Sequence, residues 1–159
     1  MASPGLRRAS LFFFFAYVGT LVLAGAWGIV GARVDMWLLL RLDLDDLGGR
    51  AATNLLSQYR FLRAIELGFG IFALRYWREI YRLPGFNRLF LSIMACGVAA
   101  RLLSLGVDGE PSPWMLAFLA FELVGLVLIF LATRASVEAS GWPRRHRSPP
   151  GRPPARAGP

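Results

Sequence analysis

Five charged residues interrupt stretches of the chain that are otherwise apolar, and they are the residues best placed to do chemistry. Arg60, Arg63 and Glu66 lie in one stretch, Arg101 lies near the end of the next, and Glu122 lies in the middle of the last. Guanidinium groups bind phosphates and carboxylates through paired hydrogen bonds, and a glutamate can exchange a proton. A charge at the bilayer centre costs at least about 2.5 kcal/mol, which makes retained charges candidates for function. These five residues form the candidate ligand-binding site.

The same residues also allow a purely structural interpretation. Arg63 and Glu66 are three positions apart, so they are neighbours on one face of a helix. Arg101 can pair with Glu122 across two helices, and such pairs would lock three helices together while Arg60 extends to the membrane surface. Both interpretations predict ion pairs, so ion pairs alone do not distinguish a binding site from a structural network.

The composition excludes several other kinds of site. The chain of 159 residues has one cysteine, Cys96, and one histidine, His146, which lies in a segment rich in proline and arginine. A zinc site, a bis-histidine haem, a Cys-His dyad and a Ser-His-Asp triad each need residues that the chain lacks. We therefore expect no metal and no cofactor.

Four apolar segments position the charges. They cover approximately residues 11–30, 57–77, 89–105 and 113–133. A bilayer core about 30 Å thick needs about 20 helical residues, so each segment has about the length of a span. Charged residues make up only 18% of the chain and hydrophobic residues 55%. The sequence therefore predicts an all-α fold, an integral membrane four-helix bundle over residues 11–133.

The distribution of arginines predicts the orientation of this bundle. Residues 1–10, the 75–88 connection and the 134–159 tail together hold 12 of the 18 arginines, and the two other connections hold three. Positive residues are enriched in cytoplasmic loops, which favours cytoplasmic N- and C-termini. The five intramembrane charges then all fall in the outer half, about 5–13 Å below the outer boundary.

A cleaved signal peptide is the alternative for the N-terminus. Arg7 and Arg8 precede a phenylalanine-rich run, and Ala24-Gly25-Ala26 offers a small-residue cleavage site. Cleavage would leave three spans. The apolar run continues through Trp27 to Val30, beyond that site, which favours an uncleaved span.

Two segments lie outside the predicted spans. The connection 31–56 mixes leucines with acids and contains Gly48-Gly49, which predicts an interfacial segment on the outer surface. The tail 134–159 is rich in proline and arginine, which predicts a disordered, basic cytoplasmic segment. No stacking aromatic is interleaved with its run of arginines from 144 onward, so we expect no nucleic-acid binding.

Small residues at four-residue spacing predict where the helices approach one another. Ala24, Gly28 and Ala32 form such a series in the first segment, and Ala64 and Gly68 do so in the second. Small residues let helix backbones come close together in lipid.

Two stretches carry a resemblance to a known family. The stretch 59–74 has an Arg60-Phe61 pair and then Gly70, and the stretch 100–125 has Arg101, a loop with Gly109 and Pro111, and Glu122. In this order the two stretches resemble a bacterial family of small four-helix membrane proteins, domain of unknown function 4345. The resemblance covers about residues 11–133 and implies the architecture but no activity. Arg63 and the long outer connection depart from the family pattern.

The sequence leaves two functional hypotheses. The first is a non-enzymatic accessory or interaction protein of the bacterial inner membrane, with the lipid bilayer and another membrane protein as partners. The second is a binder of an anionic lipid or amphiphile, or an enzyme acting on one, through the Arg/Glu cluster. Small multidrug transporters also have four spans, but a key glutamate lies in their first helix. The first segment here carries no charge, which argues against a resemblance to that class.

Overall fold

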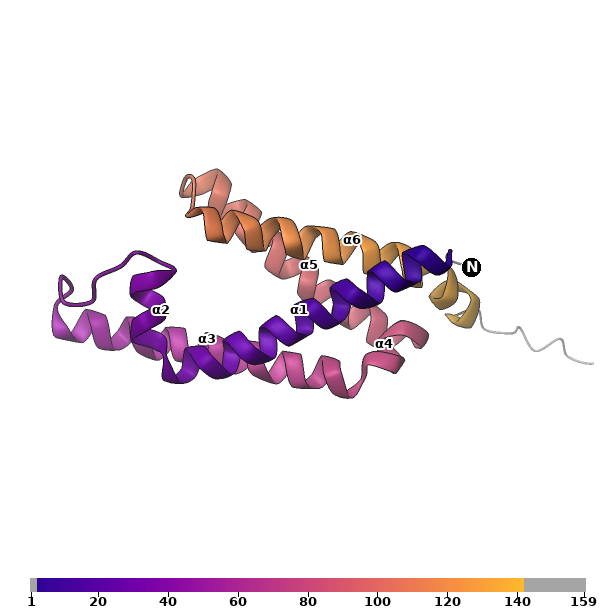
Figure 1. Cartoon of the computed structure of the whole chain (residues 1–159), viewed down its shortest axis with the longest axis horizontal. Helices are drawn as coiled ribbons and strands as arrows, with labels where there is room; N and C mark the ends of the chain where they lie inside the picture. The colour runs from indigo at the N-terminus through magenta and orange to yellow at the C-terminus, as the bar shows by residue number, and fades with distance from the viewer. Residues whose placement is uncertain (1–2, 142–159) are drawn as a thin grey trace, which may run out of the picture.

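The protein is all-helical in the computed structural model, which describes residues 3–141 (Figure 1). No strand occurs in this part of the chain. The six helices are α1 (Pro4–Val30), α2 (Ala32–Leu38), α3 (Gly49–Arg75), α4 (Trp77–Arg82), α5 (Pro84–Val107) and α6 (Pro113–Gly141). The predicted all-α class is confirmed.

Local sequence signals explain where the long helices begin. Pro4, Pro84 and Pro113 each occupy the first helical position of α1, α5 and α6. Proline fits this position because its missing N–H would have no partner there and its fixed φ is already helical. The Ser3 side chain accepts a hydrogen bond from the Leu6 N–H and so caps α1.

Three of the described helices are both long and apolar enough to cross a bilayer, not the four expected. They are α1, α5 and the Pro113–Arg134 part of α6. With 27 residues α3 is long enough to cross a bilayer, but it is less apolar because Arg60, Arg63 and Glu66 lie in its central part. Three of the five candidate site residues are therefore also the residues that make α3 less apolar than a typical span.

The ends of the elements differ from the sequence-based boundaries. The outer connection contains a helix, α2, and α3 starts at Gly49, eight residues before the expected span at 57. Helix α6 runs to Gly141, so the first eight residues of the segment expected to be a disordered tail are helical. The rest of that tail, 142–159, lies outside the described residues.

The helices form two pairs that meet at one end and separate at the other (Figure 1). One pair is α1 with α3, and the second is α5 with α6. At the end that holds the N-terminus and α4, side chains from both pairs make one apolar core, which includes Phe14, Ile80, Phe90 and Ile129. At the opposite end α2 packs on the start of α3 through a separate cluster around Met36 and Leu56.

The α1–α3 contact depends on glycines. A Cβ at Gly25 would lie 2.8 Å from the backbone nitrogen of Leu67 and 2.9 Å from the carbonyl oxygen of Arg63. A Cβ at Gly70 would lie 2.7 Å from a methyl group of Val22. The close approach of small residues is thus present at Gly28, which the spacing singled out, and also at Gly25 and Gly70, which it did not; Gly68, which the spacing singled out as well, has nothing within 4 Å of its Cβ position.

Candidate functional site

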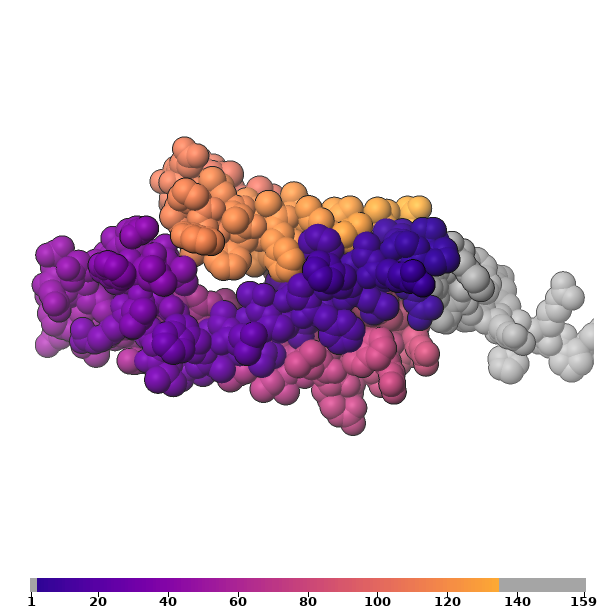
Figure 2. Space-filling view, viewed as in Figure 1, coloured from indigo at the N-terminus to yellow at the C-terminus, as the bar shows by residue number. Residues whose placement is uncertain are grey.

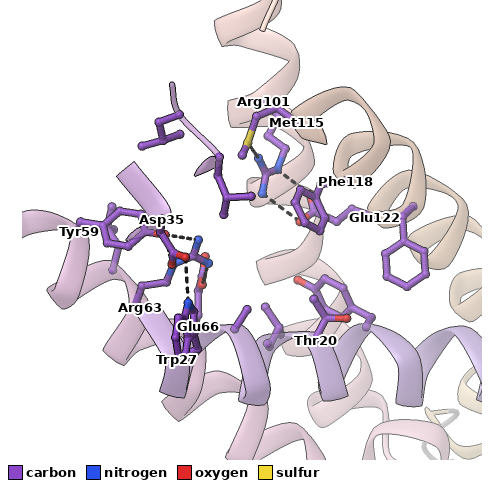
Figure 3. Close-up of a pocket in the computed structure, with 17 residues that line it drawn as sticks. Thr20, Trp27, Asp35, Tyr59, Arg63, Glu66, Arg101, Met115, Phe118 and Glu122 are labelled. Atoms are coloured by element: carbon purple, nitrogen blue, oxygen red, sulfur yellow. Dashed lines mark hydrogen bonds and ion pairs between the residues drawn. The ribbon is translucent and has the colours of Figure 1, made fainter. Parts of the chain in front are cut away.

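A cleft of about 260 Å³ lies between the two helix pairs, toward the end where they separate. The space-filling view shows the surface hollowed between the α5–α6 end and α2 (Figure 2). The close-up shows charged side chains on both sides of this space, with Thr20 of α1 along its base (Figure 3). The cleft is lined by Tyr17, Thr20, Leu21, Ala24, Trp27, Asp35, Leu39, Leu40, Tyr59, Leu62, Arg63, Glu66, Arg101, Met115, Phe118, Phe121 and Glu122.

The α3 wall of the cleft is organised around Arg63. Its Nη1 donates to the Glu66 carboxylate at 2.7 Å, and its Nη2 donates to the Tyr59 hydroxyl. The guanidinium also lies 4.8 Å from the centre of the Tyr59 ring, where the ring quadrupole attracts a cation. The aliphatic part of Arg63 crosses α1 at Gly28, where a Cβ would lie 2.5 Å from Arg63 Cγ. Arg63 is therefore held on several sides.

Asp35 completes this wall, although the sequence did not mark it as a site residue. It is 4% exposed and accepts hydrogen bonds from the indole N–H of Trp27 at 3.0 Å and from the Tyr59 hydroxyl at 2.8 Å. Tyr59 thus links Asp35 to Arg63 in one chain of hydrogen bonds. The sequence could have identified Tyr59 as part of the site, because Tyr59, Arg63 and Glu66 are spaced to share one face of α3. No such spacing marks Asp35, since it lies in the connection.

The opposite wall is the predicted pair of Arg101 on α5 and Glu122 on α6. The Nε of Arg101 donates to Glu122 Oε2 at 2.8 Å, and its Nη2 donates to Oε1 at 3.3 Å. This two-point geometry is the strong form of an arginine–carboxylate pair. The Glu122 side chain is 15% exposed and that of Arg101 is 35% exposed. The pairing predicted across the last two spans is confirmed.

The structure separates Arg60 from the other four charged residues and keeps the Arg63–Glu66 ion pair within one helix. Arg60 is not among the residues that line the cleft, because its Nε donates to the carbonyl oxygen of Ile29 at 3.1 Å. The last carbonyls of a helix lack partners within the helix, and a cation is favoured there. Arg63 and Glu66 do not lock α3 to the other pair either, since their ion pair lies within α3.

The charges that line the cleft nearly balance. Its lining includes three carboxylates, from Asp35, Glu66 and Glu122, and two guanidiniums, from Arg63 and Arg101. Every buried side-chain nitrogen or oxygen in the described part of the chain has a hydrogen-bond partner. Within that part, no cluster of histidine, cysteine or acidic residues could hold a metal ion. The arrangement suits recognition of a small polar or singly charged group beside an apolar surface.

The whole cleft lies inside a single region that matches a known family. Residues 8–133 match the family described as Domain of unknown function (DUF4345). The chain belongs to this family. The match runs from α1 into α6, so it includes both walls of the cleft, and it ends before the arginine-rich tail. Neither the curated proteins nor the solved structures contain a match to this chain.

Proposed function

We propose that this protein is a non-enzymatic accessory protein of the bacterial inner membrane that holds a singly charged anionic amphiphile in the cleft. The proposal rests on Arg101, because one of its three guanidinium nitrogens has no strong hydrogen-bond acceptor. It lines the cleft, and two of its nitrogens bind Glu122, but the partner of its Nη1 is the thioether sulfur of Met115 at 3.7 Å. Sulfur is a weak acceptor, so Nη1 keeps strong donor capacity for a carboxylate or phosphate oxygen.

The remaining surface of the cleft suits the apolar part of such a molecule. Phe118 and Phe121 extend the α6 wall beyond Glu122, and Leu21 and Ala24 belong to α1 beneath it. Most residues that line the cleft are apolar or aromatic, as is usual for a small-molecule site with a few orienting polar groups. A multiply charged headgroup does not suit this site, because the proposal offers it one nitrogen, Nη1 of Arg101, that has only a weak acceptor.

The proposed topology has four spans, with α3 as the second, and both termini in the cytoplasm. The charges at the two ends of the molecule support it. The N-terminus and α4 lie at one end (Figure 1), with Arg7 and Arg8 in α1 and Arg78 and Arg82 in α4. The connections at the other end carry acids, at 43–46 and 108–110. On this topology the cleft opens in the outer half of the bilayer.

Labelling with a membrane-impermeant maleimide tests the topology. In a Cys96→Ala background, a cysteine at Glu110 should react from outside intact cells, and a cysteine at Gly85 should react only after permeabilisation. Gly85 has open space around its Cβ position, so the substitution is tolerated. Reaction of both cysteines from outside would contradict the four-span orientation. N-terminal sequencing of the mature protein is the companion control, since a chain that starts at Trp27 would mean that the first span is cleaved.

Binding of two matched amphiphiles tests the function. Purified protein should bind dodecanoate at least about tenfold more tightly than dodecanol, because a hydrogen bond to a charged group contributes about 1.5–3 kcal/mol. Ala24→Phe, which fills the base of the cleft, should weaken dodecanoate binding. Arg60→Leu is the control, since Arg60 does not line the cleft, and it should bind as the wild type does. Equal affinity for the two amphiphiles, or no effect of Ala24→Phe, would refute an anion-binding cleft.

A further inference from the structure

A second hollow lies on α5 and α6, away from the cleft. It is a groove of about 590 Å³ along the facing sides of these two helices. On α5 its lining runs from Asn87 to Ala95, and on α6 from Leu126 to Arg134. Eight residues of helix correspond to about 12 Å, which is the approximate length of the groove.

The polar end of the groove holds two arginines. Arg88 lies in the second turn of α5, and Arg134 lies at the end of the apolar part of α6. Both are exposed, and among the side chains that the structure describes neither forms an ion pair with a carboxylate. The groove also begins close to the N-terminus of α5, where the helix dipole favours an anion. This end therefore offers positive charge that no described carboxylate neutralises.

Apart from Ser92, the rest of the groove is apolar. Leu91 and Ala95 of α5 face Leu126, Val127 and Phe130 of α6 along its length. Both helices are apolar enough to span a bilayer, so a groove that runs along them meets lipid acyl chains. A pair of cations at one end of an apolar groove matches a phosphate headgroup with its acyl chain.

We infer that this groove binds an anionic phospholipid of the cytoplasmic leaflet, with the phosphate between Arg88 and Arg134 and an acyl chain along Leu91 and Phe130. Basic pockets between membrane helices on the cytoplasmic side are a known way to recognise anionic headgroups. The inference rests on the membrane topology proposed above and not on the cleft. The two sites lie in opposite leaflets and take different molecules, so either can fail without the other.

Native mass spectrometry in mild detergent tests the groove, with phosphatidylglycerol and phosphatidylcholine of identical acyl chains as probes. The wild type should bind phosphatidylglycerol at least about tenfold more tightly. Arg88→Gln/Arg134→Gln should lower that affinity about 25-fold, since each arginine near an anionic headgroup contributes about fivefold. Ala95→Phe keeps both charges but fills the apolar part, and it should also weaken binding.

The matched control is Arg75→Gln/Arg78→Gln. It removes two arginines from the same end of the molecule, and neither lines the groove. It should change phosphatidylglycerol affinity less than about twofold. Equal losses in the two double variants would show a diffuse charge effect and overturn the inference. Displacement of the lipid by millimolar inorganic phosphate would mean an anion site without an acyl-chain groove, and it would overturn the inference as well. A failure here leaves the dodecanoate experiment on the cleft unaffected.

Discussion

Arg101→Leu and Glu122→Leu, each made alone, should lower the free energy of unfolding by about 3 kcal/mol. Each change leaves the other member of a two-point ion pair without a partner in a largely apolar setting, and removal of one partner of a buried pair typically costs about 3–5 kcal/mol. We expect the lower end of that range because the Arg101 side chain is 35% exposed. Equilibrium unfolding in mild detergent, followed by circular dichroism, measures the loss.

The double variant Arg101→Leu/Glu122→Leu should recover most of this stability. Two leucines remove both charges together and suit packing between α5 and α6, and replacing a buried ion pair with apolar residues is often neutral or stabilising. The coupling energy between the two sites should therefore be large. Strictly additive losses in the double variant would contradict the two hydrogen bonds between these side chains.

Gly25→Ala should lower the free energy of unfolding by about 2 kcal/mol, which is typical of overpacking in a tight core. The new methyl group would meet backbone atoms of α3, the nitrogen of Leu67 and the carbonyl oxygen of Arg63. Backbone atoms cannot rotate away as a side-chain tip can, so α1 and α3 must separate. Thermal unfolding in the same detergent is the measurement.

Gly19→Ala is the matched control for this change. Gly19 lies in the same helix, and its Cβ position has nothing within 4 Å. Alanine is a better helix former than glycine by up to about 1 kcal/mol, so this variant should be as stable as the wild type or more so. If both alanine variants behaved alike, the close α1–α3 contact at Gly25 would not exist as described.

The helices and the Arg101–Glu122 pair could be predicted from the sequence because both depend on local patterns. The apolar runs 89–105 and 113–133 predicted α5 and α6, although α5 begins earlier, at Pro84, and α6 continues to Gly141. The hairpin they form places Arg101 and Glu122 at similar depth, and two opposite charges on adjacent helices in an apolar setting pair with each other. The spacing of Arg63 and Glu66 likewise specified their ion pair within α3.

The remaining features depend on how α1, α2 and α3 pack against one another, which no local pattern encodes. Asp35 belongs to the site because α2 folds back onto α3 and brings its carboxylate to Tyr59. Arg60 leaves the site because α1 ends beside it and supplies the carbonyl of Ile29. The face of α1 that meets α3 carries Gly25 as well as Gly28, and small residues are common enough in α1 that the four-residue spacing selected Gly28 but not Gly25.

The affinity of the Arg101→Leu/Glu122→Leu variant for dodecanoate tests whether Arg101 holds an anionic headgroup in the cleft. This variant should be close to the wild type in stability but should lack the guanidinium that we propose holds the headgroup. We predict dodecanoate binding at least about tenfold weaker than that of the wild type, with dodecanol binding little changed. If the stable double variant binds dodecanoate as tightly as the wild type, the Arg101–Glu122 pair is structural and Arg101 does not hold the headgroup.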